Sequence, residues 1–83
     1  MKERMLSQII ELANSFGLSL YDVANAKMFL ENHEFELSFD TIMTQLYEYD
    51  IKIDNEFYIL TLSTLDKMKI DKAKYEYVKE LIL

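Results

Sequence analysis

His33, the only histidine of the chain, lies among three glutamates, Glu31, Glu34 and Glu36. An imidazole and nearby carboxylates can bind a metal ion together, so this segment is the first candidate for a chemical site. Zinc sites need three or four convergent ligands, mostly nitrogen or sulfur, and the chain has one histidine and no cysteine. We therefore interpret His33 as an exposed residue near a helix end and predict no metal site.

Residues 50–56 include four oxygen-bearing side chains, Asp50, Asp54, Asn55 and Glu56, which is a partial match to a calcium-binding loop. The segment lacks the glycine of the sharp turn and the spacing of a twelve-residue loop between two helices. The chain offers no second histidine and no lysine dyad that could serve as the base to activate a serine or threonine nucleophile. It also contains no glycine-rich phosphate-binding loop. We expect a non-enzymatic protein that needs no cofactor.

Acidic residues are concentrated in the middle of the chain. The formal net charge is -6, yet residues 1–30 are neutral, and residues 57–83 have five lysines against four acids. Residues 31–56 have eight acids against one base, Lys52. Such a block repels phosphate and attracts cationic surfaces, so it predicts a basic protein partner and argues against direct nucleic-acid binding.

Length and composition bound the architecture. With 83 residues, of which 51% are hydrophobic, the chain suffices for one core, so we expect a single domain spanning residues 1–83. The absence of cysteine means that packing must stabilise it without disulfides. No apolar run is long enough for a transmembrane helix, and the amino-terminal pattern does not match a signal peptide. We expect a cytoplasmic protein with no membrane contact.

Apolar residues recur with helical spacing over residues 5–16, and Gly17 stands where a left-handed cap would end that helix. Ser19 and Asp22 resemble a capping box, which predicts a second helix over residues 20–30. Because this second helix is apolar on nearly all sides, we expect it to be the most buried element.

Changes in the spacing of apolar residues predict the remaining elements. Residues 34–37 predict an extended link, and Ser38 a cap for a third helix over residues 39–49. Residues 51–60 alternate with period two and predict a β-hairpin with a three-residue loop, in which Ile53 faces Phe57. A second capping-box pattern at residues 63–66 and a break near Ile70 precede a final helix over residues 72–83. The fold class is therefore mainly α with one small β-hairpin, and an all-α bundle is the alternative.

This order of elements resembles a winged-helix domain: three helices, then a hairpin whose second strand reads Glu56-Phe57-Tyr58-Ile59-Leu60-Thr61, then a last helix. The resemblance implies that residues 39–49 are a recognition helix and the hairpin a wing. DNA recognition requires lysine or arginine near the base-contacting side chains, and this helix exposes acids, threonine and glutamine instead.

Three functions remain open. The leading prediction is a protein-interaction module or inhibitor that docks on a basic partner, with tyrosines beside the acids as contact area; a phage or mobile-element mimic of nucleic acid is its sharper form. The alternatives are a winged-helix transcriptional regulator and a self-associating assembly protein, with a homodimer as the candidate assembly. The predicted partner-binding residues are Glu34, Glu36, Asp40, Gln45, Tyr47, Glu48, Tyr49, Asp50, Asp54, Glu56 and Tyr58.

Overall fold

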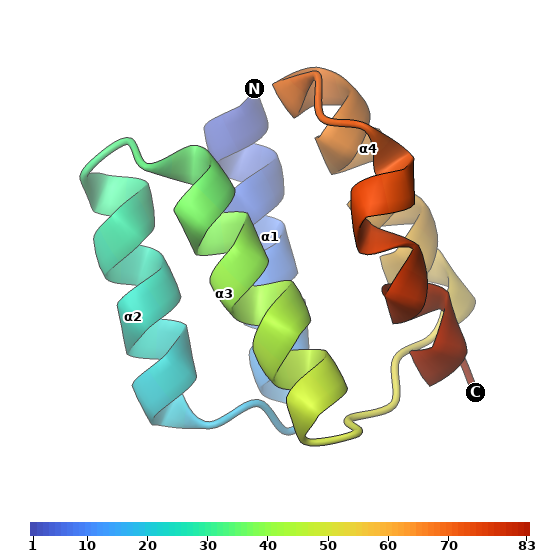
Figure 1. The fold of residues 1–83 in the computed structure, drawn as a ribbon. Coiled ribbons are helices and arrows are strands. Elements are labelled where there is room, and N and C mark those ends of the chain that lie inside the picture. The colour runs from blue at the N-terminus through green and yellow to red at the C-terminus, as the bar shows by residue number, and fades with distance from the viewer.

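The chain folds into five helices and contains no strand. The computed structural model describes residues 1–83, and its elements in order are α1 (Lys2–Ser15), α2 (Leu20–Glu31), α3 (Phe35–Glu48), α4 (Asn55–Met68) and the 3₁₀-helix η1 (Lys72–Leu81) (Figure 1). Successive helices run in alternating directions along one axis. Helix α1 contacts α2, α3 and α4, and η1 packs across α3 and α4. None of these helices combines the length and apolar character needed to cross a bilayer.

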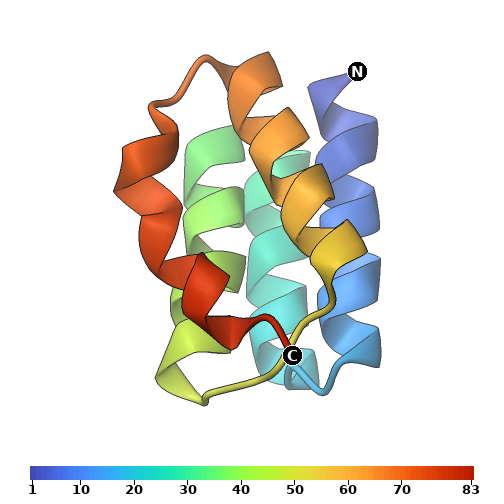
Figure 2. The ribbon, with the colours of Figure 1, turned by 90° about the vertical axis from the view of Figure 1, so that its right-hand side faces the viewer.

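Alternating helix directions give the molecule two distinct ends. We call the end where residues 16–19, 49–54 and 82–83 meet the loop end, and the other the opposite end (Figure 2). At the loop end, the amide of Ile53 donates to the Leu81 carbonyl at 3.0 Å, and the amide of Leu83 donates to the Ile53 carbonyl at 3.0 Å. These two bonds attach the last residues of the chain to the segment between α3 and α4.

Local signals in the first thirty residues act as predicted. Helix α1 ends at Ser15, and Gly17 takes a φ of 117°, which a residue with a Cβ rarely adopts. The Ser19 hydroxyl oxygen accepts a hydrogen bond from the Asp22 amide at 3.2 Å and caps α2. The prediction that α2 is the most buried element is wrong, because only one side of it faces the core.

Helix α3 starts four residues earlier than predicted. Glu34 is its N-cap and Phe35 its first residue, so the expected extended link over residues 34–37 is wrong. Ser38 caps nothing; its buried hydroxyl donates to the Ala26 carbonyl of α2 at 2.7 Å. A buried hydroxyl must find an acceptor, and this one ties α2 to α3.

The predicted β-hairpin over residues 51–60 is absent, and helix α4 occupies most of that segment. An Asp54 carboxylate oxygen accepts from the Phe57 amide at 2.7 Å, which makes Asp54 the N-cap of α4. The buried residues of α4 follow helical spacing: Phe57, Thr61, Thr64 and Leu65. The apparent period of two arose because Ile51 and Ile53 belong to the non-helical segment before this helix, where Ile53 makes a single β-bridge with Ile82.

Without a hairpin there is no wing, so the winged-helix resemblance does not hold. The capping-box pattern at residues 63–66 also fails as a helix start, because it lies inside α4. There Thr64 is buried and its hydroxyl donates to the Leu60 carbonyl at 2.7 Å. Hydroxyl groups within helices often bond in this way to the preceding turn.

The chain does break near Ile70. Helix α4 ends at Met68 with Lys69 in the left-handed region, and the Asp71 side chain caps η1 by accepting from the Ala73 amide at 3.0 Å. The 3₁₀ geometry of η1 was not predicted. Its backbone is kinked at Tyr75, where φ is -122° and ψ is 23°, so η1 consists of two short helical pieces. The buried residues Tyr75, Val78 and Leu81 recur every three positions, which is the period of a 3₁₀-helix.

Seventeen residues form one core between the helices. Helix α3 contributes Phe39, Ile42, Met43 and Leu46, all fully buried. The core also contains Leu6, Ile9, Ile10, Ala13, Leu18, Val23, Ala26, Ile53, Phe57, Leu65, Tyr75, Val78 and Leu81.

Candidate interaction surface

The acidic block of residues 31–56 is divided between the two ends of the molecule. Glu31 and Glu34 flank the turn between α2 and α3 at the opposite end. Glu36 lies in the first turn of α3 and forms a 2.7 Å ion pair with Lys74 of η1, which raises the pKa of that lysine. Glu34 and Glu36, two of the predicted partner-binding residues, therefore do not join the acids near residue 50.

Asp40 forms a structural hydrogen bond between two helices. Its carboxylate accepts a 3.0 Å hydrogen bond from the Tyr75 hydroxyl. Tyr75 is buried and packs edge-on against Phe39, with 4.9 Å between the ring centroids. Burial, together with the neighbouring Asp40 carboxylate, raises the pKa of the Tyr75 hydroxyl. We assign Asp40 to holding η1 on α3.

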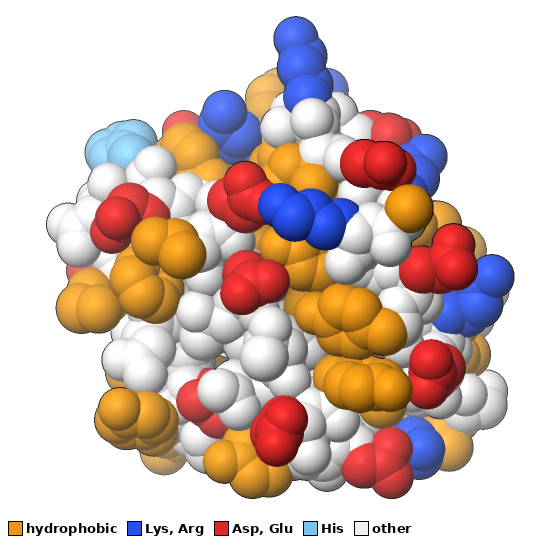
Figure 3. Space-filling model, viewed as in Figure 1, with side chains coloured by type: hydrophobic (Ala, Val, Ile, Leu, Met, Phe, Trp, Pro, Cys, Tyr) orange, Lys and Arg blue, Asp and Glu red, His pale blue; other side chains and the backbone are white.

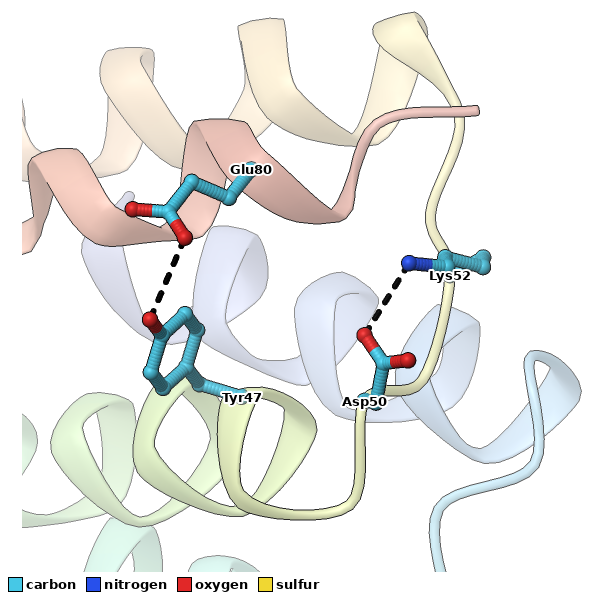
Figure 4. A network of polar contacts seen from close by, with 4 residues as sticks. All are labelled: Tyr47, Asp50, Lys52 and Glu80. Carbon is cyan, nitrogen blue, oxygen red and sulfur yellow. Dashed lines mark hydrogen bonds and ion pairs between the residues drawn. The ribbon is translucent and has the colours of Figure 1, made fainter.

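Tyr47 lies in the last turn of α3, close to the loop end, and contacts η1. Its hydroxyl donates a hydrogen bond to the Glu80 carboxylate of η1 at 3.1 Å (Figure 4). Its ring packs edge-on against Tyr77, with 4.9 Å between the ring centroids. The bond to Glu80 raises the pKa of Tyr47. The side chain is still 43% exposed, so one side of the ring is open to solvent.

Acids and an exposed tyrosine meet at the carboxyl end of α3. Tyr49 is 66% exposed, and the flanking Glu48 and Asp50 are exposed as well. Lys52 pairs with Asp50 at 3.0 Å (Figure 4), and it is the only lysine or arginine between residues 28 and 66. This exposed pair is worth about 0–1 kcal/mol, so Lys52 offsets only part of the local negative charge.

The placement of Glu48 and Asp50 is unfavourable for the helix that carries them. A helix carboxyl terminus bears a partial negative charge, which favours cations by about 0.3–1 kcal/mol each. Helix α3 has no basic residue in its last turn. Glu48 and Asp50 therefore add to the negative potential of the helix end, and a cation placed there would interact favourably with both acids and with the helix dipole.

Asp54 and Glu56 start α4 at the same end. Asp54 is the helix cap described above, so its carboxylate already has a structural role. Glu56 is exposed in the first turn, where the helix dipole favours an acid. Both still contribute negative charge to the loop end.

The two remaining predicted residues are poor candidates for direct contact. Tyr58 is partly buried and packs against the core, and Gln45 is half-buried in α3.

Sequence analysis missed two features of the loop end. The first is Glu80, which lies in a stretch of near-zero net charge, so the charge pattern of the sequence did not indicate it. The second is an open hollow lined by Gly17, Ser19, Tyr49 and Ile51, which forms only where two loops distant in sequence meet.

Charge is thus unequal between the ends. In the face shown in Figure 3, most visible lysine and arginine side chains lie over the opposite end, while acids dominate the lower half. His33 is exposed at the opposite end in the turn after α2, with a φ of 61° and its ring against Phe35. No three histidine or acidic side chains converge into a metal-binding group.

We define the acidic surface as Tyr47, Glu48, Tyr49, Asp50, Asp54, Glu56 and Glu80. Comparison with known proteins finds no match to a protein-family model, a curated protein sequence or a solved structure.

Proposed function

We propose that this protein is a non-enzymatic interaction module that docks on a basic protein surface through its acidic surface. The observation that carries the proposal is the position of Glu48 and Asp50 on either side of the exposed Tyr49 at the negative end of α3. Acids placed against a helix dipole cost stability in the free protein. A cationic partner would remove that cost, and the tyrosine would supply apolar contact area of the kind found in interface cores.

Each element of the acidic surface has a role in this proposal. Glu48 and Asp50 attract an arginine or lysine side chain of the partner, and Tyr49 can pack against the aliphatic part of that side chain or face its charge. The hollow beside Tyr49 offers space for a small apolar group. Charges of this type mainly set the association rate and the choice of partner.

A transcriptional role through a winged helix loses its structural basis, since the chain has no wing. Helix α3, the proposed recognition helix, is also covered by η1 along the side of Asp40 and Tyr47.

A pair of charge-matched triple variants tests the proposal. One neutralises the loop end with Glu48→Gln, Asp50→Asn and Glu56→Gln. The other makes the same change in net charge at the opposite end with Glu3→Gln, Glu31→Gln and Glu34→Gln. All six carboxylates are exposed, and none has a partner in another helix. Binding of a short arginine-rich peptide is measured for each by calorimetry.

Removing three charges at about 8 Å from the bound cations costs about 0.5 kcal/mol each at the dielectric of water, or roughly tenfold in Kd. We expect this loss for the loop-end variant and at most about threefold for the opposite-end variant, which acts only through the long-range field. Equal losses in both variants would contradict the proposal.

The natural partner is sought by affinity capture with the same two variants as bait. A protein retained by the wild type and the opposite-end variant but lost with the loop-end variant supports docking through this surface. If duplex DNA releases the captured protein by competition, the partner uses the same basic surface for nucleic acid, as the mimic hypothesis predicts.

A further inference from the structure

The hollow at the loop end forms where two segments distant in sequence meet. Its lining consists of Gly17 and Ser19, from the turn between α1 and α2, and of Tyr49 and Ile51, from the segment that follows α3. Its volume is about 420 Å³, near the lower end of the range for ligand pockets, which is about 300–1,000 Å³. An open hollow of this size suits one or two amino-acid side chains of a partner protein.

The chemistry of this lining favours an apolar occupant. Tyr49 offers a ring that is 66% exposed, and Ile51 is partly buried against the core. The Ser19 hydroxyl is already engaged, because it accepts from the Asp22 amide and donates to the Asp22 carboxylate at 3.0 Å. Beyond its chain neighbours, no atom lies within 4 Å of the position that a Cβ would take on Gly17. A side chain that enters the hollow therefore meets mainly aromatic and aliphatic groups.

Negative charge surrounds this apolar lining. The two segments that form the hollow, residues 16–22 and 47–52, contain three acids and one base, which gives a net charge of -2. The acids are Asp22, Glu48 and Asp50, and the base is Lys52. Along the loop end in Figure 3, acidic and hydrophobic side chains lie next to one another. Cationic groups are therefore favoured beside the occupant of the hollow.

We propose that the hollow binds one leucine-sized side chain of the partner, and that arginine or lysine residues flank this side chain in the partner's sequence. The inference rests on the proposed function, because the acids beside Tyr49 attract the same partner, and it adds an apolar determinant to the charge contacts. In an extended segment, alternate side chains point to the same side. A leucine with arginines two positions before and after it therefore presents all three side chains to this surface.

Two five-residue peptides with blocked ends test the proposal. Both have arginine at the first and last positions and serine at the second and fourth, and the central residue is leucine in one and asparagine, which has nearly the same shape, in the other. Half-burial of the leucine side chain corresponds to a roughly fivefold lower Kd in NMR titrations of the wild-type chain. Equal Kd values would overturn this inference alone, whereas binding of neither peptide would overturn the proposed function as well.

A matched pair of variants locates the contact. Ile51→Thr keeps a branched side chain but puts a hydroxyl into the lining, and Ile59→Thr makes the same change at a residue that is 54% exposed on α4. We expect Ile51→Thr to reduce the preference for leucine to at most about twofold and to leave the Kd of the asparagine peptide unchanged. Ile59→Thr should retain the full preference. A preference that survives in Ile51→Thr, or that disappears in both variants, would overturn the proposed site.

Nuclear Overhauser effects in the wild-type complex provide a measurement that needs no variant in the lining. The methyl protons of the peptide leucine should show contacts with the Tyr49 ring and with the Ile51 methyl groups, and contacts with other residues alone would overturn the proposal. The loop-end triple variant should weaken both peptides by the same factor and keep the preference for leucine, because the apolar contact does not depend on the acids. Loss of that preference together with the charges would overturn the proposal.

Discussion

Replacing Ile53 by alanine should destabilise the protein far more than the same replacement at Ile59. Ile53 is 1% exposed and lies in the segment before α4, whereas Ile59 is 54% exposed on the outer side of that helix. The comparison is informative because a β-hairpin over residues 51–60 would bury both isoleucines on one face. Only the helical arrangement separates them.

The sizes of the two effects follow from burial. Truncating a fully buried isoleucine to alanine costs about 2–5 kcal/mol, and we expect about 3 kcal/mol for Ile53→Ala. A chain of this length has a total stability of roughly 4–12 kcal/mol. At Ile59 the lost burial is about 1 kcal/mol, and the higher helix propensity of alanine returns up to about 0.5 kcal/mol. We expect a net cost of about 0.5 kcal/mol for Ile59→Ala.

Urea denaturation followed by circular dichroism measures both. With a slope near 1 kcal/mol per M, typical of a small domain, the Ile53→Ala midpoint should fall by roughly 3 M and the Ile59→Ala midpoint by about 0.5 M. The backbone bonds between Ile53 and residues 81–83 do not involve the Ile53 side chain, so we expect the variant to keep them and the slope not to change. Costs of similar size for the two replacements would refute the helical placement of residues 55–60.

Three further predictions concern single contacts. Asp54→Ala should lower the free energy of unfolding by about 1 kcal/mol in urea titrations through loss of the α4 cap, while an unchanged midpoint would speak against that cap. Lys74→Ala should lower the urea midpoint only slightly, because solvent screens the half-exposed pair with Glu36, and a large loss of stability that persists at high salt would contradict this account. The pKa of Tyr75 is raised in the folded chain, so the folded state binds this proton more tightly; stability is full below the ordinary pKa near 10 and falls as pH rises above it. Tyr75→Phe, which loses about 1 kcal/mol with the bond to Asp40, should flatten that alkaline decline in thermal melts, and an equally steep decline would contradict this assignment.

Signals carried by a few neighbouring residues predicted structure well. Gly17 and Ser19 end one helix and begin the next, and each acts through its own backbone or side chain. The break near Ile70 is of the same kind, since Asp71 caps η1 without help from distant residues.

The hairpin prediction failed because ten residues are too few to separate a period of two from a helical period. Ile51, Ile53 and Phe57 fit both patterns, and the choice depends on which face the rest of the chain covers. The cap at Asp54, three residues before Phe57, was the local signal in favour of a helix. The three-residue spacing of Tyr75, Val78 and Leu81 was a similar signal for η1.

The acidic block shows how sequence proximity differs from proximity in space. A 14-residue helix is about 21 Å long, so Glu34 and Glu48, at its two ends, cannot act on one small site. The lysine that pairs with Glu36 comes from η1, 38 residues later, and its position required the tertiary fold. Sequence alone identified the acids at the end of α3 but not their separation from the others.

The most direct test of the acidic surface is an NMR titration of the wild-type chain with the arginine-rich peptide, in which each backbone amide reports its own response. We predict the largest shifts at residues 47–52 and at Glu80, with weaker effects at Asp54 and Glu56, and a loss of these shifts as salt rises. Shifts spread evenly over all acidic residues, or concentrated at residues 31–36, would contradict the proposed surface.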